Sequence, residues 1–91
     1  MIDNVRSAVL NEAAELVNGT RQSDYGPPEK SFACVAKMWS AYLGDRELTA
    51  GDTCRMLALL KIARLSNGPH FDSSLDACGY MALGEEMDQT T

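Results

Sequence analysis

One short stretch of this 91-residue sequence holds an unusual share of its polar chemistry. Residues 21–32 read RQSDYGPPEKSF, which places charged and phenolic side chains around a Gly-Pro-Pro break. Its candidate binding residues are a fixed cation, a phenol and two carboxylates: Arg21, Tyr25, Asp24 and Glu29. Arginine presents a planar fork of donors that matches a phosphate group. We therefore expect this stretch to form one wall of a phosphate-binding site.

A second pair of cations lies in the stretch LLKIARL. Lys61 and Arg64 are about one helical turn apart and their neighbours are apolar. One interpretation is that they stabilise the negative end of a helix and keep their charged groups in water. The other is that both point into a groove and bind phosphate.

Two pairs of carboxylates are spaced so that each pair shares one helix face. Asp72 and Asp76 are four residues apart, and Glu12 and Glu15 are three apart. In the structural interpretation, Asp72 caps a helix and Asp76 complements its dipole. In the functional one, the pair either binds the Lys61 and Arg64 side chains or helps to hold Mg²⁺, an ion that takes one or two carboxylates together with waters and phosphates. The second pair is either an ordinary exposed face or part of the same metal site.

Other polar and aromatic residues carry weaker signals. His70 stands alone in the turn NGPHF and reads as a surface residue, while Trp39 and Tyr42 fit a core stripe or an oligomer contact. The sequence has no Walker-type glycine loop, no HExxH, no GxSxG and no CxxC. The remaining chemistry is a metal-assisted phosphate reaction or plain binding.

Composition limits the class of protein. The net charge is -5, which argues against general binding to nucleic acid. The three cysteines lack a paired spacing and read as buried free thiols in a reducing interior: Cys34, Cys54 and Cys78. No stretch approaches the roughly 20 apolar residues of a membrane span, and the first residues do not resemble a signal peptide. We expect a cytoplasmic protein.

Apolar periodicity and turn residues predict the elements that position these groups. We expect one all-α domain over residues 1–91, a small four-helix bundle completed by homo-oligomerisation, since so short a chain buries a small core. The third helix has an apolar face wide enough for neighbours on more than one side. The expected helices run from Ile2 to Val17 with Gly19 at positive φ beyond it, from near Pro28 to Gly44, from a Thr49–Asp52 capping box to about Ser66, and from Asp72 or Ser73 onward.

The polar stretches also follow one another in a familiar order. GTRQSDYGPPEKSF, MWSAYLG, LTAGDTCRMLALLKIARL and DSSLDACGYMALGEE together resemble a family of small bacteriophage-encoded helical proteins of unassigned function. More distantly, the sequence is similar to the MazG-type all-α nucleoside triphosphate pyrophosphatases. That resemblance implies an acidic metal cluster of Glu12, Glu15, Asp72 and Asp76, with Lys61 and Arg64 as phosphate contacts.

Three functions remain open on these grounds. The first is binding of a phosphorylated small molecule, a nucleotide, which in an enzyme would be hydrolysed with Mg²⁺ by an activated water attacking an inner phosphorus. The second is a non-catalytic counter-defence protein that sequesters a nucleotide signal or masks a host protein, and the third is a structural or assembly module. The first requires that the corner after the opening helix and the junction of the last two helices meet, in one subunit or across two. Replacing Lys61 and Arg64 together by alanine should then abolish binding.

Overall fold

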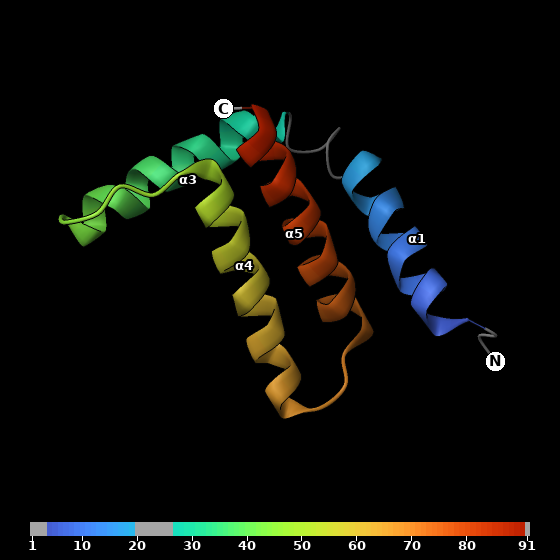
Figure 1. The fold of residues 1–91 in the computed structure, drawn as a ribbon. Coiled ribbons are helices and arrows are strands. Elements are labelled where there is room, and N and C mark those ends of the chain that lie inside the picture. Colours follow the sequence, from blue (N-terminus) through green and yellow to red (C-terminus); the bar gives the residue numbers. More distant parts are fainter. Residues whose placement is uncertain (1–3, 20–26, 91) are drawn as a thin grey trace.

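The computed structural model describes residues 4–19 and 27–90, and over these the fold is entirely helical (Figure 1). Four α-helices and no strand occur in the described residues, which confirms the predicted all-α class. Oligomerisation remains a prediction. The elements are α1 Val5–Asn18, α3 Pro28–Leu43, α4 Ala50–Arg64, the short 3-10 helix η1 Leu65–Asn67, and α5 Phe71–Thr90.

The centre of the fold is an antiparallel hairpin of α4 and α5 (Figure 1). α1 packs against the side of α5 that faces away from α4. α3 crosses the end of the hairpin where α4 begins, and then extends past α4 on the side away from α5. α3 therefore lies across the end of the helices instead of alongside them.

The ends of α3 and α4 follow the predicted local signals. α3 begins at Pro28, and Gly44 closes it with a left-handed φ of 81° while its amide donates to the carbonyl of Ser40. At the start of α4 the Thr49 amide donates to the Asp52 carboxylate at 3.0 Å, and the Asp52 amide donates to the Thr49 hydroxyl at 3.1 Å. This reciprocal pair is the predicted capping box.

The predicted end of α1 is wrong in detail, and the predicted start of α5 is right to within one residue. Gly19 follows α1 with a φ of -115°, so the positive φ expected there does not occur. α5 begins at Phe71, one residue before the expected start, and the His70 ring caps it. Nδ1 of His70 lies 3.2 Å from the Ser73 amide and 2.8 Å from its hydroxyl. His70 thus satisfies an amide that the sequence had assigned to Asp72 as the cap.

The buried core is small and consists mostly of small side chains. Its hydrophobic members among the described residues are Ala13, Ala36, Cys54, Ala58, Leu75 and Met87. A Cβ added at Gly84 would lie 3.2 Å from Cβ of Cys54, so this glycine allows α4 and α5 to approach closely.

Several large apolar side chains lie outside this core. Tyr42, predicted as a core or oligomer residue, is 90% exposed, and Leu59 on α4 is 64% exposed. Cys34 is also exposed, so the expectation of three buried thiols is correct for Cys54 and wrong for Cys34. None of the described helices is long and apolar enough to cross a membrane.

Candidate functional site

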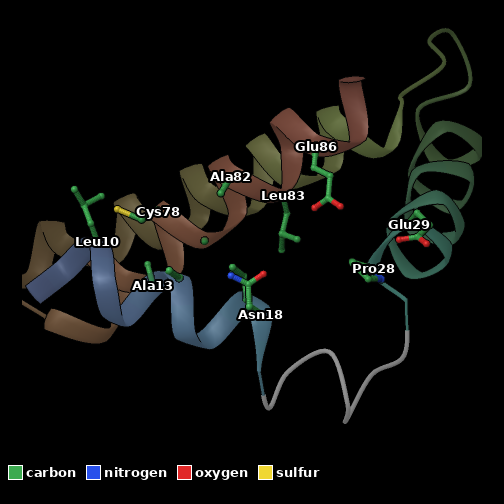
Figure 2. A pocket seen from close by; sticks show the side chains of 12 residues that line it. Leu10, Ala13, Asn18, Pro28, Glu29, Cys78, Ala82, Leu83 and Glu86 are labelled. Atoms are coloured by element: carbon green, nitrogen blue, oxygen red, sulfur yellow. The ribbon is translucent and has the colours of Figure 1, made fainter. Parts of the chain in front are cut away.

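A groove lies between α1, the stretch of α5 from residue 78 to residue 86, and the start of α3 (Figure 2). Its volume is about 470 Å³. We call it the α1–α5 groove. The lining residues are Leu10, Ala13, Ala14, Val17, Asn18, Pro28, Glu29, Cys78, Gly79, Ala82, Leu83 and Glu86.

The walls of the groove are made largely of small and apolar residues. α1 contributes Ala13 and Ala14, and α5 contributes Gly79 and Ala82. A Cβ added at Gly79 would lie 3.0 Å from Cγ1 of Val17, so the glycine sets how near the two helices come. Short side chains on both helices leave a recess instead of a filled interface.

The polar groups of the groove gather at one end. Figure 2 shows Asn18, Glu29 and Glu86 around the opening between the end of α1 and the start of α3, whereas Leu10 and Cys78 lie at the other end. The first turn of α3 has no side-chain cap, because Pro27 stands at the capping position. An uncapped helix N-terminus carries a partial positive charge that favours an anion. The groove therefore has apolar walls and one polar end, where the carboxylates of Glu29 and Glu86 lie beside the N-terminus of α3.

Three of the sequence-predicted binding residues, Arg21, Asp24 and Tyr25, lie outside the described residues. The two flanks of that segment are described, and Asn18 and Pro28 both line the α1–α5 groove. Glu29, the fourth candidate of the stretch, is in the first turn of α3 and also lines the groove.

Lys61 and Asp76 form an ion pair between α4 and α5. Nζ of Lys61 lies 3.1 Å from Oδ2 of Asp76, and the two side chains are only 17% and 11% exposed. The pair thus joins the two central helices, which matches the expectation that Asp76 grips Lys61. Arg64 and Asp72 are exposed near the turn between the same helices.

The α4–α5 turn and the polar end of the groove lie far apart in one chain. Fourteen residues separate Asp72 from Glu86 along α5, which corresponds to about 21 Å of helix. The structure therefore does not bring Lys61 and Arg64 together with Glu29 within a single subunit. A meeting of the two corners across subunits stays a prediction.

The second predicted acidic pair is not gathered with the first. Glu12 and Glu15 are exposed on α1. Across residues 4–19 and 27–90, no three histidine, cysteine or acidic side chains come together in a way that could hold a metal ion. The four-carboxylate cluster implied by the MazG resemblance is not assembled in this part of one chain.

Sequence reasoning missed an ionic cluster at the other end of the hairpin. Arg55 on α4 reaches Asp88 on α5 at 2.8 Å and Asp52 at 3.3 Å. These carboxylates raise the pKa of Arg55, and the backbone bond from Thr49 lowers the pKa of Asp52. The (i, i+3) spacing of Asp52 and Arg55 was a visible signal, but the contact with Asp88 depends on the hairpin. This cluster fixes the end of α5 beside the start of α4.

Two further groove residues were also missed, namely Glu86 and Cys78. Glu86 stands in the acidic stretch GEEMD, which reads as a solvated helix face, and only the approach of α1 and α3 makes it part of a groove. Cys54, in contrast, is an inert structural thiol, because burial raises its pKa to about 11.

Comparison with known proteins places the chain in a phage lineage. Two proteins called Gene 55 protein are similar over 81 residues, at 40% identity in Mycobacterium phage L5 and 36% in Mycobacterium phage D29. The aligned segment covers 88% of this chain, 52% of the L5 protein and 53% of the D29 protein, so the chain spans about half the length of these relatives. No solved structure matches the sequence significantly. Residues 8–88 match the family described as Domain of unknown function (DUF6378), and the chain belongs to that family.

Proposed function

We propose that this protein binds a phosphorylated small molecule, a nucleotide, in the α1–α5 groove. The observation that carries the proposal is the division of the groove into an apolar part and a polar end beside an uncapped helix N-terminus. A nucleotide has the same division, with a flat base at one end and phosphates at the other.

The size and walls of the groove suit the base and the sugar. Small-molecule sites have volumes of roughly 300–1,000 Å³ with mostly apolar walls and a few polar groups. The volume of about 470 Å³ falls within that range. Ala14 and Ala82 line the groove and are exposed, so their short side chains leave room for a planar ring along the groove.

The polar end suits phosphate when a divalent cation accompanies it. Glu29 and Glu86 would repel a bare phosphate, whereas Mg²⁺ commonly binds one or two carboxylates together with substrate phosphates and waters. Such a cation arrives with the nucleotide and needs no preformed cluster of three carboxylates. The first turn of α3 then supplies the positive end of a helix dipole. Arg21 and Tyr25 remain proposed contacts from the segment that joins the two flanks of the groove.

Lys61 takes a structural role in this proposal, because its charge is already paired with Asp76. The earlier expectation that Lys61 and Arg64 hold the phosphates applies only to an assembly in which a second subunit brings them to the groove. In an enzyme, Glu29 and Glu86 would hold a Mg²⁺ ion that supplies positive charge beside the phosphates, and a water would attack an inner phosphorus as the bond to the pyrophosphate leaving group breaks.

A thermal-shift titration tests this proposal directly. A nucleotide at about a hundred times its dissociation constant adds roughly 2.7 kcal/mol of stability, which shifts the Tm of a domain this small by many degrees. We expect a shift with nucleotide and Mg²⁺ together, and a smaller one without Mg²⁺. Ala82→Trp, which fills the groove, should remove the shift, and Glu86→Gln should reduce its Mg²⁺-dependent part.

The matched control is Glu47→Gln, because Glu47 is an exposed carboxylate in the α3–α4 connection and does not line the groove. Its Tm shift should equal that of the wild type. If Ala82→Trp keeps its helical circular dichroism and still shows the full nucleotide shift, the groove is not the site.

Analysis of the nucleotide after incubation with the protein separates turnover from sequestration. Release of pyrophosphate on addition of Mg²⁺ would support a hydrolase, whereas recovery of unaltered nucleotide from a stable complex would support a counter-defence protein that sequesters a signal. Failure of every nucleotide and cyclic dinucleotide to shift the Tm would exclude both and favour a protein partner.

A further inference from the structure

α4 is apolar on two opposite faces, and one of them lacks a partner in the described chain. Cys54 and Ala58 are buried on the side of α5. A second row, spaced at i, i+3, i+4 and i+7, lies about half a turn around the helix from the first. Its members are Met56, Leu59, Leu60 and Ala63, and all of them are exposed.

α3 extends this surface. It passes α4 on the side away from α5, so that the two helices form an open corner (Figure 1). The second half of α3 carries three more exposed large apolar side chains: Met38, Tyr42 and Leu43. We call the outer row of α4 and these three residues the α3–α4 surface.

The amount of exposed apolar surface is what a stable protein partner would cover. A large side chain offers about 200 Å² when fully exposed, so the three large residues of the outer row of α4 expose roughly 300 Å², and Met38, Tyr42 and Leu43 on α3 expose roughly 400 Å² more. A standard interface buries about 800 Å² per partner.

We propose that a second copy of this chain covers the α3–α4 surface, with α4 packed antiparallel against α4 of its partner around a two-fold axis. The charges along α4 favour this direction, since Asp52 lies in its first turn and the exposed Arg64 lies in its last turn. Antiparallel packing places the basic end of each α4 beside the acidic start of the other and also pairs their dipoles favourably. A single apolar row that packs on itself gives the isologous contact of a two-fold dimer.

The arrangement has a geometric consequence for the basic turn. The end of α4 that carries Lys61 and Arg64 lies, in each copy, toward the α3 end of the other copy. The dimer thus brings the α4–α5 turn of one subunit near the end of the hairpin where α3 crosses in its partner.

Mass measurement in solution tests the proposal. By sedimentation or light scattering, the wild-type chain should have twice the monomer mass. Leu59→Glu with Leu60→Glu should convert it to a monomer with unchanged helical circular dichroism, because neither side chain faces α5. The control is Met81→Glu on α5: Met81 is 51% exposed, much like Leu60 at 52%, but lies outside the α3–α4 surface, so its variant should stay dimeric.

Disulfide crosslinking tests the direction of packing. In a Cys34→Ser background, Leu60→Cys lies near the middle of the row and should crosslink to its own copy under oxidation. Met56→Cys should not crosslink to itself but should crosslink to Ala63→Cys when the two variants are mixed. A monomeric wild type would overturn the proposal. The α3–α4 surface would then be a candidate contact for the additional residues that the longer relatives contain. A dimer that survives Leu59→Glu with Leu60→Glu, or Met56→Cys pairing with itself, would overturn it as well.

Discussion

The pairing of Lys61 with Asp76 provides a sharp test of what holds the two central helices together. The test compares three variants: Lys61→Met, Asp76→Asn and the two substitutions together. Methionine keeps the aliphatic stem of the lysine and removes its charge. The two charged atoms are 3.1 Å apart, and both side chains are more than four-fifths buried. Their direct attraction is about 5 kcal/mol at an effective dielectric constant of 20, and desolvation of the two charges cancels much of it.

The expected net coupling lies between that of an exposed pair, at most about 1 kcal/mol, and the 3–5 kcal/mol lost on breaking a buried one. We expect a coupling energy of about 2 kcal/mol. Each single variant should then lower the Tm by roughly 8–16 °C, at 4–8 °C for each kcal/mol in a domain of this size. The double variant should cost no more than either single variant, because it leaves no unpaired charge behind.

Urea unfolding followed by circular dichroism, in a double-mutant cycle, measures this coupling. The cycle is needed because Asp76 takes part in further interactions, which a single substitution would also remove. Arg64→Ala is the control: Arg64 is exposed one turn away, so its loss should change stability by less than about 0.5 kcal/mol. A coupling below about 0.5 kcal/mol would refute the structural role of the pair and return Lys61 to the list of ligand-binding candidates.

Three further predictions concern the ends and crossings of the helices. The hydrogen bonds from Thr49 lower the pKa of Asp52 below its usual 3.8, so the ionised carboxylate stabilises the fold. Above about pH 5 the urea midpoint of the wild type should therefore exceed that of Asp52→Asn. The difference between the two midpoints should vanish as the pH falls below 3.8. A difference that grows in acid would contradict this sign. Gly84→Ala should destabilise the protein by about 1 kcal/mol, because the new methyl group would lie 3.2 Å from Cβ of Cys54 and this cost exceeds the gain in helix propensity; an unfolding midpoint above that of the wild type would show that α4 and α5 are not this close. Gly44→Ala should also cost about 1–2 kcal/mol. A Cβ at Gly44 would meet no atom within 4 Å, so the cost comes from its left-handed φ of 81°. Gly44→Asn should cost less than Gly44→Ala in the same urea experiment, because asparagine adopts left-handed φ more readily.

Local signals explain the parts of the fold that could be predicted. Pro28 and Gly44 delimit α3, and Thr49 with Asp52 begins α4, because each acts through the backbone of its own turn. Gly19 shows the limit of this reasoning. A glycine permits a left-handed cap but does not require one, and the chain leaves α1 with a negative φ.

The groove could not be predicted, because it depends on how helices far apart in the sequence approach one another. Glu86 and Glu29 are 57 positions apart and share a site only through the packing of α1 and α3 near the end of α5. Periodicity identified the apolar residues of α4 correctly, but it does not tell which apolar face meets α5 within the chain. Leu59 and Leu60 belong to the wide apolar face predicted for the third helix, and they lie on the surface of the described chain.

The resemblance to small phage proteins agrees with the DUF6378 match and with the two Gene 55 relatives. The more distant MazG resemblance stays an expectation. Its implied cluster would need Glu12 and Glu15 on α1 to share a cation with Asp72 and Asp76 at the start of α5, and the described residues do not gather them in one chain.

Mapping of backbone amide shifts by NMR, during titration with nucleotide and Mg²⁺, tests the proposed groove most directly. The account predicts that the amides of α1 and of residues 78–86 of α5 move together, with Ala13, Gly79 and Ala82 among them, while those of the α4–α5 turn around Gly68 stay in place. Movement confined to the α4–α5 turn, with the α1–α5 groove unchanged at saturating ligand, would contradict it.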